Sequence, residues 1–187
     1  MPEPRIPLLS KEDAKQAAKQ AGVVEAIASL NIFRILLRHP KLAKQVNDLL
    51  MTLLFKGRLD ARLRELVIMR IGWSTGSVYE WTQHWRIALG LGVTEAELLA
   101  VRDWRTHADW SPADRAVLAA TDDTLAHGAV SPATWAECQA ALPDAGEQLE
   151  LLAAIGAWHM ISQILRSLEV PLEEGVAPWP PDGAAPH

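Results

Sequence analysis

Three polar side chains that can handle a proton stand close together in the middle of the sequence. Ser77, Glu80 and His84 are separated by three and four residues, steps that place side chains on one face of a helix. The same face continues with apolar residues toward Leu91. A polar group that points toward a core must find a partner or a ligand. The pattern therefore predicts a small polar site at the head of an apolar helix face.

A further carboxylate, Glu65, precedes this group on the helix predicted before it. A short Gly-Ser connection folds the two helices back antiparallel, so Glu65 can meet His84. Histidine titrates near neutral pH, and a nearby carboxylate stabilises its charged form. A half-buried carboxylate has a raised pKa, which suits a general acid. We therefore expect Glu65, Glu80 and His84 to converge on one pocket as catalytic residues, with Ser77 and Trp81 lining it.

Simpler interpretations of these residues stay open. Glu80 and His84 also form an ordinary i, i+4 pair of a solvated helix face, and Glu65 could pair with Arg62. Ser77 fits a helix cap better than a nucleophile. Glu80 and His84 are only two ligands on one helix, whereas a catalytic zinc usually has three protein ligands. We therefore expect neither a metal nor another cofactor.

Helices must position these residues, because helix punctuation is dense and strand signals are nearly absent. Serine or aspartate caps, proline at first helical positions and one Thr94–Glu97 capping box mark the starts. The predicted helices span 11–21, 24–37, 40–57, 60–73, 77–91, 94–104, 112–126, 132–140 and 146–168. These elements predict an all-α fold, a compact multi-helix bundle. On the last helix, Trp158 belongs to the main apolar stripe, and we expect His159 beside it to be a core or interface residue.

Composition limits the class of partner. The chain has 187 residues and a net charge of −5, which argues against a nucleic-acid partner because such binding needs a basic footprint. The only cysteine, Cys138, excludes an intrachain disulfide and a CxxC redox pair. The longest charge-free stretch near the C-terminus has 15 residues, shorter than the roughly 20 that a membrane span needs. We expect a cytoplasmic protein that binds a small molecule and no membrane.

The chain is long enough for one domain with additions at both ends. We expect an N-terminal extension over 1–22, a helical domain over 23–170 and a proline-rich tail over 171–187. The tail contains five prolines between 171 and 186, and we predict an extended or disordered arm there.

The central stretch resembles a known family. The matching phrases are Arg62-x-x-Glu65-Leu-x-Ile68 and Tyr79-Glu80-Trp81-x-x-His84, and the spacing Glu65-x11-Ser77-x2-Glu80-x3-His84 is that of the family's Glu, Cys, Cys and His. The chain is similar over about 31–171 to the carboxymuconolactone decarboxylase-like family, which includes alkylhydroperoxidase-D-like proteins. The resemblance implies an all-helical alkylhydroperoxidase-D-like fold and a homo-trimer or homo-hexamer with sites near subunit contacts.

The departures from this family decide which activity the resemblance implies. Ser77 and Glu80 replace the two cysteines of the peroxidase branch, and they cannot form a disulfide or a sulfenic acid. Cys138 lies outside the motif, among apolar neighbours that disfavour a thiolate. The resemblance therefore implies the decarboxylase branch, a lyase acting on a carboxylated lactone-like substrate, although no arginine can be assigned to the carboxylate. The alternatives are a non-catalytic oligomeric binding or scaffold protein and a residual alkylhydroperoxidase.

Overall fold

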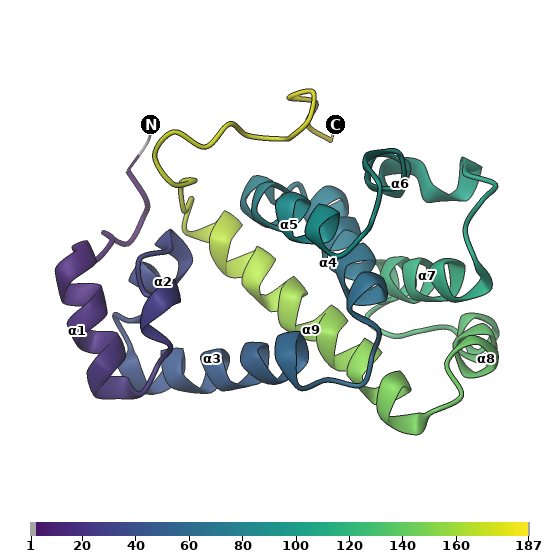
Figure 1. The fold of residues 1–187 in the computed structure, drawn as a ribbon, viewed down its shortest axis with the longest axis horizontal. Coiled ribbons are helices and arrows are strands. Elements are labelled where there is room, and N and C mark those ends of the chain that lie inside the picture. Colours follow the sequence, from purple (N-terminus) through teal and green to yellow (C-terminus); the bar gives the residue numbers. More distant parts are fainter. Residues whose placement is uncertain (1–2, 187) are drawn as a thin grey trace. The chain divides into compact units, whose positions relative to one another are not determined.

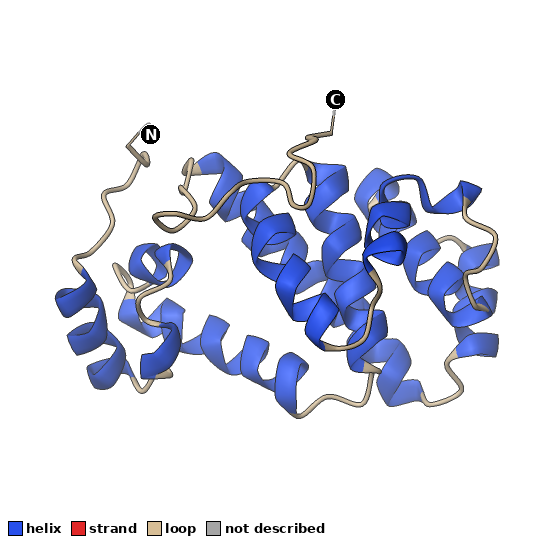
Figure 2. Ribbon diagram, turned by 45° about the horizontal axis from the view of Figure 1, so that its top comes forward, coloured by secondary structure: helices blue, strands red, loops and turns tan. Residues whose placement is uncertain are grey.

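The structure is a computed structural model that describes residues 3–186. Within these residues it contains nine α-helices and two 3-10 helices, and no strand (Figures 1 and 2). The all-α prediction is confirmed. None of the described helices combines the length and the apolar character that crossing a membrane would need.

The chain divides into two compact units. One holds the chain up to Lys56 together with Gln163–Val176, and the other holds Gly57–Ser162 and the segment from Ala177. All five predicted site residues belong to the second unit. The domain limits expected at 22 and 170 stay a prediction.

The first unit contains three α-helices and a short 3-10 helix. They are α1 (Lys11–Ala21), η1 (Glu25–Ile27), α2 (Asn31–Leu36) and α3 (Pro40–Phe55). The single helix predicted over 24–37 is wrong, because Leu30 is extended and separates η1 from α2. Asn31 explains the break: its amide donates to the carbonyls of Pro171 and Leu172, and its backbone N–H donates to Glu173. These partners lie about 140 residues away and leave no signal in the local sequence.

The second unit is built around α4 (Ala61–Thr75), which packs against α5 (Val78–Gly90), α7 (Pro112–His127) and η2 (Val101–Thr106). The remaining helices are α6 (Glu95–Ala100), α8 (Pro132–Ala141) and α9 (Ala145–Ser167). From Gln163 onward α9 belongs to the first unit. Most side chains of α4 are buried, including Arg64 and Glu65, so its charged groups must be paired within the fold.

The helix predicted over 94–104 is also divided. Its capping box is present, but α6 ends at Ala100 and a 3-10 turn follows in which Asp103 has non-helical angles. Arg70 of α4 donates to the carbonyls of Val101 and Arg102, which satisfies acceptors that a continuing α-helix would use itself.

The end of the tail is folded onto the second unit rather than free. The indole N–H of Trp81 donates to the carbonyl of Pro180, and the Trp179 backbone N–H donates to the Thr82 hydroxyl. Asp182 accepts two hydrogen bonds from Arg102, at 2.7 and 2.8 Å. These contacts place residues 179–182 beside α5, as Figure 1 shows in yellow, and the predicted disordered arm is wrong for this segment.

Candidate active site

The α4–α5 hairpin positions most of the candidate site. The Asp60 carboxylate caps α4 by accepting from the backbone of Arg62 and Leu63, and Gly76 ends it in the left-handed conformation with φ 68°. The next residue, Ser77, begins the return helix. Gly72 lets the helices approach closely, since a Cβ there would lie 2.9 Å from the Trp81 backbone nitrogen.

Glu65 and His84 meet across this hairpin. The Glu65 Oε2 lies 2.7 Å from the His84 Nδ1, and no part of the Glu65 side chain is exposed. The other oxygen of Glu65 accepts hydrogen bonds of 3.2–3.3 Å from the guanidinium of Arg64. The buried carboxylate therefore has a cation on one oxygen and the imidazole on the other.

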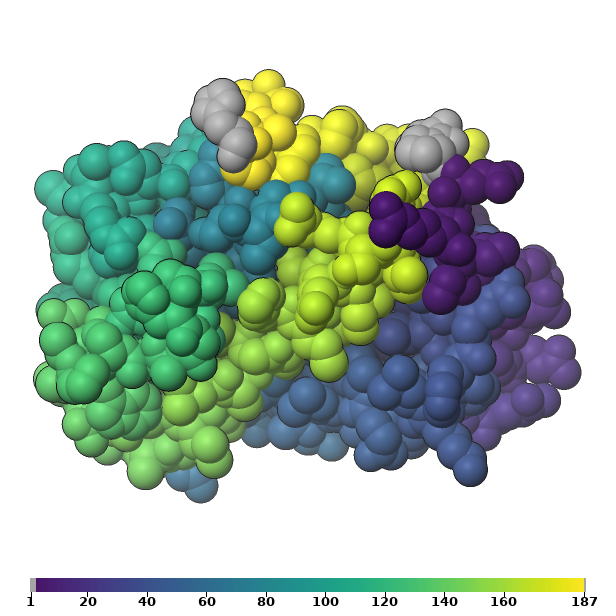
Figure 3. Space-filling model, turned by 180° about the vertical axis from the view of Figure 1, so that it is seen from behind, coloured from purple at the N-terminus to yellow at the C-terminus, as the bar shows by residue number. Residues whose placement is uncertain are grey.

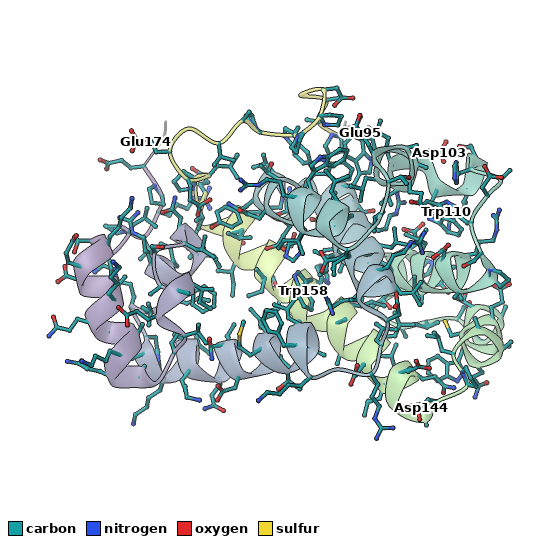
Figure 4. The ribbon with its side chains drawn as sticks, in the orientation of Figure 1. Glu95, Asp103, Trp110, Asp144, Trp158 and Glu174 are labelled. Carbon is teal, nitrogen blue, oxygen red and sulfur yellow. The ribbon has the colours of Figure 1, made fainter. Side chains whose placement is uncertain are left out.

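The second nitrogen of His84 faces two groups. Trp158 of α9, labelled in Figure 4, directs its indole N–H to the His84 Nε2 at 3.2 Å. Glu80, one turn earlier on α5, has its Oε2 3.6 Å from the same nitrogen. Because an indole N–H can only donate, this hydrogen bond exists in the neutral tautomer of His84 that carries its proton on Nδ1 toward Glu65; a proton on Nε2 replaces it by the contact with Glu80. The Nε2 lone pair is then the basic position of the site.

The electrostatics of the site centre on Glu80. Burial raises the pKa of Glu80 to about 7; His84 opposes this shift and Glu65 adds to it. For His84, burial alone would lower the pKa, but the Glu65 carboxylate outweighs burial and, with Glu80, raises the pKa above its usual value. Glu80 therefore changes its charge near neutral pH, and its titration is coupled to that of His84.

The structure brings Glu65, Glu80 and His84 together, as the helix spacing predicts, and their catalytic role stays a prediction. Ser77 occupies the N-cap position of α5, but its side chain does not cap the helix, so the expected capping role is wrong. Trp81 is fully buried and directs its indole to the tail, with its ring 5.2 Å from Trp73. Trp81 therefore supports the side of α5 that contacts the tail, where the Arg102 guanidinium lies over the Trp81 ring.

Two arginines of α4, Arg62 and Arg70, are engaged away from this site. Arg62 binds Glu97 and Asp114, which ties α4 to α6 and α7. Arg70 binds Asp122. Pairing of Glu65 with Arg62, one of the simpler interpretations, is therefore wrong.

The described residues around His84 leave few atoms available to coordinate a metal. No group of three or more His, Cys, Asp or Glu side chains in that part of the chain has the arrangement of a metal site. Both ring nitrogens of His84 already have hydrogen-bond partners, Glu65 and Trp158.

Two other residues singled out in the sequence lie away from the site. His159 is exposed on α9, whose outer surface is visible in Figure 3 in yellow-green. Of the two expected places, the core is therefore wrong and an interface stays a prediction. Cys138 is buried on α8 and directs its thiol to the carbonyl of Ala116 at 3.6 Å. Burial, together with Glu137 and Asp123, raises the pKa of this thiol to about 11, in agreement with the predicted unreactive cysteine.

Sequence reasoning missed two members of the site. Trp158 was assigned to an apolar stripe, although a buried indole N–H usually finds a partner and that requirement is a usable signal. Arg64 directly precedes Glu65, and adjacent helical residues do not normally face each other. Its contact arises because both side chains are buried, at 5% and 0% exposure, and a buried charge needs a counterion.

Comparison with known proteins supports the resemblance. Residues 40–123 match the Carboxymuconolactone decarboxylase family. The match is narrower than the expected 31–171; it contains Glu65, Ser77, Glu80 and His84 and ends before Trp158. No curated protein sequence matches this chain.

Solved structures share the fold. The alkylhydroperoxidase AhpD core of an uncharacterized peroxidase-related protein from Ralstonia eutropha JMP134 has a TM-score of 0.74 at 17% identity, covering 93% of this chain and 94% of that one. A debrominase in complex with 2,3,4-tribromopyrrole has a TM-score of 0.69 at 17% identity, with 89% and 90% covered. A putative antioxidant defence protein from Agrobacterium tumefaciens has a TM-score of 0.67 at 20% identity, with 72% and 92% covered. At these identities the likeness shows the fold alone, and the alkylhydroperoxidase-D-like fold prediction is confirmed.

Proposed function

Residues 40–123 carry the carboxymuconolactone decarboxylase family region, and from this premise we propose that the chain is a small-molecule enzyme that transfers protons through Glu65, His84 and Glu80. The observation that carries the proposal is the buried approach of two carboxylates to one imidazole, at 2.7 and 3.6 Å. The two carboxylates have different environments and can take different roles: Glu65 is paired with Arg64 and His84, whereas burial raises the pKa of Glu80.

Each residue of the set has a distinct role in this proposal. Glu65, paired with Arg64 through its other oxygen, accepts a hydrogen bond from the His84 Nδ1 and orients the ring. The His84 Nε2, which accepts the Trp158 indole N–H, takes a proton as general base when the substrate replaces this hydrogen bond. Glu80, whose pKa lies at about 7, can give or take a proton at neutral pH, where a general acid–base catalyst is most effective.

The specific reaction we propose is that of a lyase on a carboxylated lactone-like substrate. The bond between the lactone framework and its carboxylate breaks, carbon dioxide leaves, and the electron pair remains on the conjugated framework. A proton from Glu80 or from protonated His84 then bonds to the carbon that has lost the carboxylate. The step consumes one proton and changes no oxidation state of the protein, so it needs only the acid–base set.

The burial of Glu80 favours an enzyme over a scaffold protein. Keeping an acid 4% exposed, with its nearest ionisable partner 3.6 Å away, costs free energy that a purely structural helix pair would not need to spend. Strongly perturbed acids gather at functional sites because catalysis uses them.

The position of Cys138 argues against a thiol peroxidase. Such an enzyme needs an accessible thiolate, whereas this thiol is buried, bonded to a backbone carbonyl and has a pKa of about 11. Ser77 and Glu80 offer no sulfur in the position of the family's two cysteines.

The test is turnover of a carboxylated γ-lactone, followed by release of carbon dioxide. We expect His84→Ala and Glu65→Gln to lower kcat by about 10²–10⁴-fold, the usual contribution of a general acid–base group. The matched controls are His159→Ala, which removes an exposed histidine, and Cys138→Ala; both should retain activity. Turnover of an organic hydroperoxide with a dithiol that requires Cys138 and survives His84→Ala would overturn the proposal.

A further inference from the structure

The Ser77 hydroxyl is a buried polar group that the proton-transfer set does not use. Ser77 is 1% exposed, and its Oγ has no hydrogen-bond partner among the residues that the structure describes. Buried polar groups almost always have a partner, because a buried group without one loses the hydrogen bonds that it makes to water in the unfolded chain. Its neighbour across the loop, Thr75, shows the usual case, because the Thr75 hydroxyl is bonded to both Ile71 and Ser162.

The position of Ser77 relates it directly to the acid–base pair. Ser77, Glu80 and His84 follow one another at three and four residues along α5. At a rise of 1.5 Å per residue, the backbone of Ser77 lies about 4.5 Å from that of Glu80 and about 10.5 Å from that of His84 along the helix axis. The separation between the hydroxyl and the proton-transfer pair is therefore within the length of a small molecule.

The arginines of α4 do not compete for this role. Arg62, Arg64 and Arg70 are each bound to carboxylates of the protein itself. The N-terminus of α5, by contrast, carries the positive end of the helix dipole, and the Ser77 side chain does not cap it. A helix N-terminus with an available hydroxyl favours an oxygen that carries partial or full negative charge.

We propose that the Ser77 hydroxyl, together with the N-terminus of α5, binds a carbonyl or carboxylate oxygen of the substrate. This inference rests on the proposed function and deepens it. It defines the substrate class as a small molecule with such an oxygen about 5–10 Å from the atom that exchanges a proton at Glu80 and His84. Ser77 binds in this assignment and does not attack, because the basic Nε2 of His84 lies two turns away and is engaged by Trp158.

Ser77→Ala tests the assignment, with Ser162→Ala as the matched control. Ser162 is also a buried serine, but its hydroxyl is 2.8 Å from the Thr75 hydroxyl. The probes are γ-butyrolactone, the same lactone bearing a ring carboxylate, and tetrahydrofuran, which keeps the ring and lacks the carbonyl. Their dissociation constants are measured by calorimetry, and the melting temperatures of the variants are measured in parallel.

We expect Ser77→Ala to weaken binding of the lactones about 5–10-fold, the effect of one lost hydrogen bond, and to leave tetrahydrofuran unchanged. Its melting temperature should stay level or rise, because the variant removes an unsatisfied group. Ser162→Ala should lower the melting temperature and leave every affinity unchanged. Weakening of both lactones assigns the contact to the carbonyl, and weakening of the carboxylated lactone alone assigns it to the carboxylate.

Three results would overturn the inference. They are unchanged affinities in Ser77→Ala, an equal loss for tetrahydrofuran, and no binding of either lactone to the unsubstituted protein. The first would leave an ordered water as the partner of Ser77. The proposed function fails by a separate result, retention of turnover in His84→Ala, so the two failures are distinguishable.

Discussion

Two acidic side chains in the second unit, Asp122 and Glu80, show how the same chemical group can serve opposite purposes. Asp122 accepts hydrogen bonds from Arg70, Arg105 and the indole of Trp104. Burial alone would raise the pKa of Asp122, but the bonds from Arg70 and Trp104 outweigh burial and lower it. Glu80 is buried more deeply, and among the described residues its one ion-pair partner is His84, at 3.6 Å; its pKa rises to about 7.

The difference lies in the partners and not in the acid. Arg70 projects from α4 to Asp122, whereas on the α5 side the same helix presents Glu65, itself a carboxylate. Asp122 therefore remains charged and ties α4 to α7, while Glu80 keeps a proton that it can release near neutral pH. An uncompensated buried acid is the feature that distinguishes the candidate active site from an ion-pair cluster.

The largest expected contrast is in stability at pH 8. Asp122→Asn leaves Arg70 facing a neutral amide, and breaking such a pair costs about 3 kcal/mol of unfolding free energy. Glu80→Gln should leave the unfolding free energy unchanged or raise it, because it replaces a buried ionisable group by a neutral one. Urea unfolding of both variants measures the contrast, and equal losses would contradict it.

Glu80 and Asp122 should make the unfolding free energy depend on pH in opposite directions. The folded pKa of Glu80, about 7, exceeds its unfolded value of 4.5. Its contribution is therefore fully present below pH 4.5 and is lost as pH rises through about 7, a change of about 3 kcal/mol. His84 acts in the same direction, since its folded pKa also exceeds its ordinary value.

Asp122 should act in the other direction. Its contribution is present above its unfolded pKa of 3.8 and is lost as pH falls through its lower folded value. Unfolding free energies between pH 3 and 8 check both statements. Glu80→Gln should reduce the change of unfolding free energy with pH between pH 4.5 and 7. Asp122→Asn should reduce that change only below pH 3.8. The comparison is refuted if each variant instead alters the pH range assigned to the other.

The smallest expected effect concerns the close approach that sets Glu80 in place. In Gly72→Ala the new Cβ would lie 2.9 Å from the Trp81 backbone nitrogen and 3.4 Å from the Glu80 Cβ. Such overpacking costs about 1–3 kcal/mol and should displace Glu80, so the melting temperature and turnover fall together. The control is Gly156→Ala on α9, where a Cβ would meet nothing within 4 Å. This variant should raise the unfolding free energy by up to about 1 kcal/mol. A tolerated Gly72→Ala would show that the hairpin does not hold Glu80.

Local signals predicted most helix limits. The cap of Ser10 and the left-handed Gly22 bound α1 as expected, and Ser111 with Pro112 starts α7 as expected. These signals work because a cap is formed by residues within one turn of it. The helix predicted over 24–37 is wrong because the partners that break it lie near residue 172.

The sequence by itself determined that Ser77, Glu80 and His84 share a helix face, because that relation depends only on the helical period. It also determined that Glu65 can return to His84, because the loop between their helices is short. Tertiary structure alone decided the chemistry of each group. Trp158 reaches His84 from 74 residues along the chain, Arg64 turns to Glu65, and Ser77 keeps a free hydroxyl. Burial and the choice of partners set pKa values, and both arise from packing between elements that the local sequence does not record.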